Sequence, residues 1–329
     1  MHFIDEFRKE SQEHIIHNAP CGTNVNDLAQ WLKVGGIQLF KNAFFQETGQ
    51  IVPNLPNGQL IEQAYPKNLN EINKQQKKHP FYAANAKIFC NVCMDIVDSI
   101  LNSNSDPRHE IYAGQHYHLL RNLTLDALAL LSDWAALTQD TPEMYGIVKN
   151  NQHDSFQISQ AADQLMFGGS RLFSFSDLAT DAGTALLRVA LETRIRFGFG
   201  LLGVMDLSNQ SVLPLNMSKI LEAIKLHQDH FKLAIPLPHI ERIYGWSNIY
   251  VHIGLKHFTW SPIFAHKYLN PLLRGGSYPG GSSVYAGICI DEKTIVDIQH
   301  EAGCIYGLDA TKYELITIPP AQCSVILTT

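Results

Sequence analysis

Apolar residues recur at helical spacing along most of the first 273 residues of the chain. Near the start, Phe3, Phe7 and Ile15 fit one face of a helix. Thr23 or Asn24 is suited to cap a second helix, because short polar side chains accept hydrogen bonds from the first free N–H groups. Further helices are predicted over residues 81–103, 112–139, 154–173, 174–206, 215–231 and 236–254.

The pattern changes at two places. Residues 49–80 hold four prolines, many Asn and Gln residues and little periodicity, which favours a long polar connection. The Gly-rich stretch 274–283 is typical of a linker. The segments after it have strand composition, and the sequence DEK between the first two predicts a hairpin. These segments are residues 283–290, 294–299, 313–319 and 324–328.

Together the patterns predict a mainly α protein, a helical bundle with a small C-terminal β module. Three parts are expected. Residues 1–80 form an N-terminal helical segment with the long polar connection, residues 81–273 form the helical core, and residues 274–329 form the β module.

Composition favours a globular, cytoplasmic protein with a sizeable core. The chain of 329 residues is 45% hydrophobic and 17% charged. No run approaches the roughly 18 apolar residues of a membrane span, and the first residues do not resemble a secretory signal. Six cysteines without an export signal predict reduced thiols. The net charge of −6 provides no general attraction for nucleic acid.

Cys90 and Cys93 form the one C-x-x-C pair, and His116 and His118 are the nearest candidates to complete a metal site. A metal-dependent hydrolase or a redox pair is one interpretation. Small buried residues in a helix are the favoured one, because a zinc site needs a second pair of ligands at comparable spacing. Neither a phosphate-binding glycine loop nor a zinc-protease motif is found, so no metal and no cofactor are predicted.

Two groups of residues are spaced so that their side chains could form one site. Glu241, Gly245, Asn248 and His252 lie at i, i+4, i+7 and i+11, which is one face of a helix. Gly245 leaves room there for a ligand or for a close approach of the chain. His252 titrates near neutrality, but a His is also favoured at a helix C-terminus by the helix dipole.

The second group lies on an otherwise apolar helix. Arg188, Glu192 and Arg196 are spaced by four residues on one face, with Arg194 beside them. A structural ion-pair network is the favoured interpretation. Arginine would also suit a phosphate or an RNA backbone, because its planar guanidinium binds both in a bidentate manner.

The segment SNIYVHIG resembles the end of the HEPN motif (higher eukaryotes and prokaryotes nucleotide-binding), a motif of helical domains. Ser247, Asn248 and His252 fall in the register of Arg, Asn and His in its R-N-x-x-x-H form. The stretch ALLRVALETRIRF resembles the long helix that packs against the motif helix. The resemblance spans residues 110–273.

The resemblance implies a metal-independent ribonuclease in which motifs from two chains form one site. His252 would act as general acid or base, supported by Asn248 and Glu241. Because Ser247 replaces the motif Arg, an arginine of the neighbouring helix (Arg188, Arg194 or Arg196) would have to stabilise the phosphate charge. Arg188, Lys256 and Trp260 are candidate binding residues, the last two because aromatic and basic side chains in residues 254–273 would stack and hold bases. Packing under the bundle is the favoured interpretation of that segment.

Two functions are therefore almost equally supported by the sequence, which does not decide whether the chain is an enzyme. The favoured one is a dimerising interaction or regulatory component of a bacterial defence or toxin-type system, because Ser247 lacks the charge that catalysis needs. The alternative is a ribonuclease that uses His252. Expected partners are a second copy or another protein, with RNA as a further candidate and no membrane.

Overall fold

The computed structural model describes most of the chain, and the account below is confined to that part. The described residues are 3–16, 25–67, 71, 79–102, 109–138, 176–253, 257–307, 309, 311–317 and 324–327. Contacts divide the chain into two compact units. Unit 1 comprises residues 1–185 and 245–265, and unit 2 comprises residues 186–244 and 266–329. These limits fall at other positions than the composition changes near residues 80 and 273, and the three predicted parts stay a prediction.

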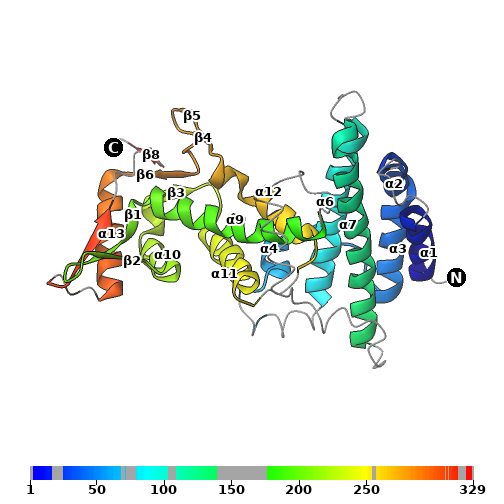
Figure 1. The fold of residues 1–329 in the computed structure, drawn as a ribbon, viewed down its shortest axis with the longest axis horizontal. Coiled ribbons are helices and arrows are strands. Elements are labelled where there is room, and N and C mark those ends of the chain that lie inside the picture. Colours follow the sequence, from blue (N-terminus) through cyan, green and yellow to red (C-terminus); the bar gives the residue numbers. More distant parts are fainter. Residues whose placement is uncertain are drawn as a thin grey trace. The chain divides into compact units, whose positions relative to one another are not determined.

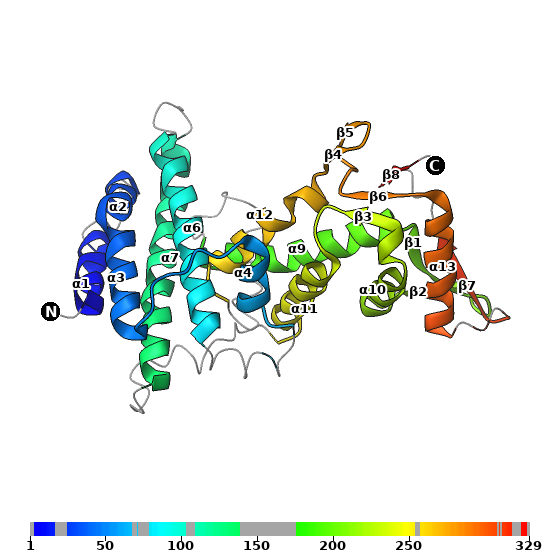
Figure 2. The ribbon, with the colours of Figure 1, turned by 180° about the vertical axis from the view of Figure 1, so that it is seen from behind.

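Unit 1 is a helical bundle built around an aromatic core. Its helices α1, α3, α6 and α7 pack on one another, as Figures 1 and 2 show from opposite sides. Phe40 lies at the centre, with its ring 4.6 Å from that of Phe89 and 5.8 Å from that of Phe7. The main elements are α1 (Phe3–Ile16), α2 (Val25–Trp31), the π-helical turn η1 (Leu32–Gly36), α3 (Ile37–Thr48), α4 (Asn57–Ala64), α6 (His79–Asn102) and α7 (His109–Thr138).

Three further helices contribute residues to both units. They are α9 (Ser176–Gly198), α11 (Leu237–Ile253) and α12 (Trp260–Leu273). Unit 1 takes the first residues of α9, the last nine residues of α11 and the first residues of α12. Unit 2 takes the remainder of each helix.

Unit 2 combines short helices with small sheets. One antiparallel sheet has the order β2-β1-β7, a second has the order β3-β6-β8, and β4 pairs with β5. Its further elements are β1 (Leu201–Asp206), β2 (Ser211–Pro214), α10 (Met217–Leu226), the 3-10 turn η3 (Gln228–His230), β3 (Phe231–Leu233), β4 (Gly276–Tyr278), β5 (Gly281–Ser283), β6 (Ile288–Ile290), α13 (Glu292–Tyr306), β7 (Tyr313–Thr317) and β8 (Val325–Ile326).

The predicted fold class is confirmed, since the chain is mainly helical with small strands toward the C-terminus. Two details are corrected by the strands of unit 2. The helix expected through residue 206 ends at Gly198, and β1 begins three residues later. The expected linker at residues 274–283 contains the β4–β5 hairpin. The expected connection at residues 49–80 contains α4. The predicted helix at 154–173 lies outside the described residues.

The strand predicted at residues 294–299 is wrong, because this segment belongs to α13. Asp291 caps the helix, and its carboxylate accepts a hydrogen bond from the Thr294 backbone N–H at 2.8 Å. Gly307 ends the helix in the left-handed conformation with φ of 62°. Ile295 and Ile298 are buried at helical spacing, so the apolar residues follow a period of 3.6 rather than 2.

No described helix is long and apolar enough to cross a membrane.

Candidate functional site

The last turns of α11 carry the residues of the resemblance. His252 lies in the final turn with an exposed side chain, and Ser247 is buried. Asn248 lies one turn before His252, and its Oδ1 atom is buried without a hydrogen-bond partner among the described residues. Glu241, four residues before Gly245, belongs to unit 2, whereas the other three residues of the predicted face belong to unit 1. The catalytic roles of these residues stay a prediction.

Gly245 makes room for the chain itself. A Cβ atom at this position would lie 2.5 Å from the carbonyl oxygen of Lys67 and 3.1 Å from its Cα. The Lys67 backbone N–H in turn donates to the Glu71 carboxylate at 2.9 Å. Of the two interpretations of this glycine, the structure therefore supports a close approach of backbone, because any side chain would collide with it.

The residues around Gly245 form an aromatic packing site. The buried Trp246 indole donates its N–H to His257 Nδ1 at 3.1 Å, and its ring centre lies 4.9 Å from that of Tyr65. The Tyr65 hydroxyl donates to the Ser261 carbonyl at 2.6 Å, and burial raises the pKa of this hydroxyl well above its ordinary value. Such aromatic pairs with satisfied polar ends stabilise a core.

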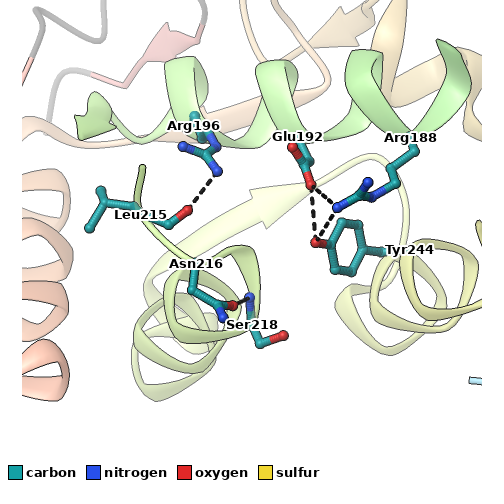
Figure 3. Close-up of polar contacts among 7 residues, drawn as sticks. All are labelled: Arg188, Glu192, Arg196, Leu215, Asn216, Ser218 and Tyr244. Atoms are coloured by element: carbon teal, nitrogen blue, oxygen red, sulfur yellow. Dashed lines mark hydrogen bonds and ion pairs between the residues drawn. The ribbon is translucent and has the colours of Figure 1, made fainter. Parts of the chain in front are cut away.

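In unit 2, Arg188, Glu192 and Arg196 leave the same side of α9, as the sequence spacing predicts (Figure 3). Arg188 forms an ion pair with Glu192 at 3.1 Å. The Tyr244 hydroxyl donates to the same carboxylate at 3.0 Å and accepts from the Arg188 guanidinium at 3.4 Å. The guanidinium also lies over the Tyr244 ring, 5.4 Å from its centre. The favoured structural network is therefore present between Arg188 and Glu192.

Arg196 and Arg194 bind backbone carbonyls instead of carboxylates. Arg196 donates to Leu215 O at 2.6 Å and to Leu202 O at 3.4 Å, next to the N-terminus of α10 (Figure 3). There Asn216 caps α10 by accepting from the Ser218 N–H at 2.8 Å. Because carbonyls outside regular ladders still require donors, Arg196 contributes to the internal structure of unit 2.

Arg194 is the more deeply buried of the two, with 9% of its surface exposed. Its Nε and Nη2 atoms donate to Leu272 O and Tyr285 O, both at 2.9 Å. These carbonyls come from the end of α12 and from the loop before β6. The guanidinium thus joins segments of unit 2 that lie far apart in sequence.

Trp260 and Lys256 are the aromatic and the basic candidates for binding nucleic-acid bases. Trp260 is fully buried, donates its indole N–H to Asn85 Oδ1 at 3.0 Å and stacks on Phe258 with ring centres 4.5 Å apart. A base could not reach this ring, so packing accounts for Trp260. Lys256 lies outside the described residues.

The cysteine pair has the properties of a buried core. Cys90 and Cys93 both lie in the buried face of α6. Burial raises the pKa of the Cys90 thiol to about 12 and raises that of Cys93 as well, which disfavours the thiolate that a metal would need. Within the described residues, no group of three or more His, Cys, Asp or Glu side chains is arranged to hold a metal ion.

Comparisons with protein-family models, curated proteins and solved structures found no match to this chain. The site is thus defined by its geometry alone. Sequence reasoning missed Tyr244 as the third member of the Arg188 cluster. It lies 52 residues from Glu192 along the chain, and no local spacing signals a contact of that kind.

Proposed function

We propose that this chain is a non-catalytic, HEPN-like helical protein of a bacterial defence or toxin-type system, which acts as a dimerising interaction or regulatory component. One observation carries the proposal. The three arginines considered as substitutes for the motif Arg all bind groups of their own unit: Arg188 binds Glu192 and Tyr244, and Arg194 and Arg196 bind backbone carbonyls.

A phosphate held by one of these guanidiniums would compete with the partners that the side chain already binds. For Arg194, loss of its present bonds would leave the buried Leu272 carbonyl without its donor, at a cost of about 1 to 3 kcal/mol, and would also release the part-buried Tyr285 carbonyl. For Arg188, it would leave the Glu192 carboxylate half-buried without its cation. With Ser247 in the motif position, these costs favour a domain that binds a partner without cleaving RNA.

The proposal is tested by mass photometry of the purified chain, together with an RNA-cleavage assay in EDTA. We expect a dimer, or a defined complex after pull-down from the native host, and no turnover of RNA. A chain that stays monomeric, captures no partner and leaves RNA intact would contradict the interaction role.

The ribonuclease is a second candidate, favoured by the free access to His252. Its side chain is exposed in the last turn of α11, and one turn earlier the Asn248 oxygen is buried without a partner among the described residues. If RNA is cut in EDTA, His252→Ala should stop the reaction, whereas Ser247→Arg should increase it by supplying the missing charge. Cleavage that continues unchanged in His252→Ala would exclude this mechanism.

A further inference from the structure

Helix α13 carries a histidine and a cysteine side by side on its outer face. His300 and Cys304 are one turn apart, and the His300 Nδ1 atom lies 3.8 Å from the Cys304 Sγ atom. Both side chains are exposed. The opposite face of the helix carries Ile295, Ile298 and Ala302, which are buried within unit 2. The pair is therefore held by a packed helix and presented outward.

The separation of the two atoms matches the spacing of ligands on one zinc ion. Zinc lies about 2.3 Å from a cysteine sulfur and about 2.0 Å from a histidine nitrogen, in tetrahedral geometry. Two such bonds at a tetrahedral angle place the sulfur and nitrogen atoms about 3.5 Å apart. The observed 3.8 Å differs from this by a few tenths of an ångström, which a small rotation of either side chain removes.

The pair supplies only half of a zinc site. Structural zinc sites have four protein ligands. Among the described residues, no third His, Cys, Asp or Glu joins a group that could hold a metal, although Asp297 and Glu301 lie on the same helix. An ion bound by His300 and Cys304 would thus keep two positions for ligands from elsewhere. Cysteine and histidine ligands select zinc over hard cations such as magnesium or calcium.

A second copy of the chain offers the two missing ligands in the same arrangement. Two-fold symmetry places the same patch of both copies at the contact, so two identical pairs make a Cys₂His₂ set. The approach of a second helix is open at Gly303, where an added Cβ atom would meet nothing within 4 Å. Val296, one turn before His300, is 57% exposed and adds apolar surface beside the pair.

We propose that His300 and Cys304 bind zinc between two copies of the chain, with one ion shared by two α13 helices. Each cysteine binds as the thiolate, so two thiol protons pass to the solvent for every ion bound. The ion keeps its charge of +2 throughout, and no oxidant or reductant takes part. The site lies on a different helix from His252, and it does not depend on the proposed function.

The test is zinc titration of the full chain by analytical ultracentrifugation, in a phosphine reductant that prevents disulfide formation. We expect dimerisation that is complete at about half an equivalent of zinc per chain, as one four-ligand ion between two copies requires. EDTA should return the chain to its zinc-free state. A large excess of zinc should lower the dimer fraction, because each copy then binds its own ion.

Three variants assign the effect to the pair. His300→Ala and Cys304→Ser should each abolish the zinc-dependent dimer, while His266→Ala, at another exposed histidine, should leave it intact. Cobalt in place of zinc should produce the visible absorption of a tetrahedral sulfur-containing site, and both pair variants should lose it. Circular dichroism verifies that the variants are folded.

Other outcomes overturn the zinc bridge. A zinc-dependent dimer that persists in both pair variants places the site elsewhere. Zinc bound at one equivalent per chain without dimerisation shows that no second copy completes it. A dimer already present in EDTA and unchanged by zinc also excludes the bridge, yet agrees with the proposed interaction role, so the two proposals fail separately.

Discussion

Helices α9 and α11 both carry the polar residues that stand out in the sequence, but they use them in different ways. On α9, Arg188, Arg194 and Arg196 all bind groups within unit 2. At the end of α11, His252 is exposed, and the Asn248 oxygen has no hydrogen-bond partner among the described residues. Charge on the apolar α9 helix therefore serves internal structure, whereas the end of α11 presents an exposed histidine.

The difference follows from what surrounds each helix. The α9 arginines lie next to strand ends, loops and the end of α12, where carbonyl groups lack donors. His252 lies in the last turn of α11, where its side chain faces solvent. The sequence left phosphate binding open as the alternative to a structural network for these arginines, and only their surroundings in the fold distinguish the two.

The largest expected effect comes from removing the most buried cation. Arg194→Met should lower the free energy of unfolding by about 4 kcal/mol, because the buried Leu272 carbonyl and the part-buried Tyr285 carbonyl lose their donors at about 1 to 3 kcal/mol each. Urea denaturation followed by circular dichroism measures this. The exposed Arg274→Met is the matched control and should change it by less than about 0.5 kcal/mol. Equal losses in both variants would show that the carbonyl contacts of Arg194 do not stabilise unit 2 more than an exposed arginine does.

Asp133 on α7 is a half-buried acid, and it tests whether a charge with less internal pairing than the α9 arginines destabilises the fold. Burial, and then the charge of Asp126, raise the pKa of Asp133 to about 7. The folded state therefore binds this proton more tightly than the unfolded state, so its contribution is present below about pH 4 and is lost as pH rises toward 7. The difference between this pKa and the ordinary value of 3.8 corresponds to about 4 kcal/mol.

The free energy of unfolding of Asp133→Asn should then match that of the wild type near pH 4 and exceed it by up to about 4 kcal/mol at pH 8. Urea denaturation at a series of pH values gives this difference. An advantage of the same size at both ends of the pH range would show that the carboxyl proton is not its cause.

Gly245→Ala tests the contact that brings the chain against α11. The new methyl group would lie 2.5 Å from the Lys67 carbonyl oxygen, so we expect a loss of about 2 kcal/mol in the free energy of unfolding. Gly183→Ala on α9 is the control, because a Cβ there meets nothing within 4 Å. It should stabilise the protein by about 0.5 to 1 kcal/mol through helix propensity. A lower melting temperature for Gly245→Ala and a higher one for Gly183→Ala would support the close contact at Gly245. A change in the same direction for both variants would contradict it.

Tyr244→Phe removes one hydroxyl from the Arg188 cluster and leaves the ion pair in place. The expected loss is about 1 kcal/mol, the net contribution of a typical hydrogen bond. The control is Tyr278→Phe, because the Tyr278 hydroxyl forms no hydrogen bond within the described residues. This variant should leave the free energy of unfolding unchanged. If Tyr244→Phe is neutral in urea denaturation, the cluster contributes less to unit 2 than its geometry indicates.

The smallest effect is expected at His252. His252→Ala should change the free energy of unfolding by less than about 0.5 kcal/mol, because the side chain is exposed. A large loss in urea denaturation would mean that His252 has a structural role, and the end of α11 would then resemble α9. A neutral result leaves its side chain available for a partner or for RNA.

Helix periodicity predicted most of the described helices, and it placed both ends of α6, α7 and α11 within a few residues. It failed where one period was mistaken for another. Residues 294–299 have strand composition but belong to α13, since the Asp291 cap and Gly307 set the helix limits. The end of α9 at Gly198 was also missed. An added Cβ there would lie 2.2 Å from Ile288, and that tertiary contact has no local signal.

For the candidate sites, local spacing was sufficient only within one helix. The shared face of Arg188, Glu192 and Arg196 could be predicted because helix geometry alone determines it. The His300–Cys304 pair has the same i, i+4 spacing, although its exposure could not be known from the sequence. In contrast, Tyr244 against Glu192 and Lys67 against Gly245 join segments far apart in the chain, and these contacts depend on how the helices pack.

The sequence by itself determined the mainly helical class, the faces of single helices and the absence of an arginine at position 247, because these depend on periodicity and residue identity. Only the tertiary structure decided which polar groups already have partners. Arg194 and Arg196 bind backbone carbonyls, and Trp260 binds Asn85. The space beside Gly245 is filled by the Lys67 backbone. The physical reason is that a donor's partners are chosen by packing between distant segments, and side-chain chemistry is the same whether the partner is a substrate or the protein itself.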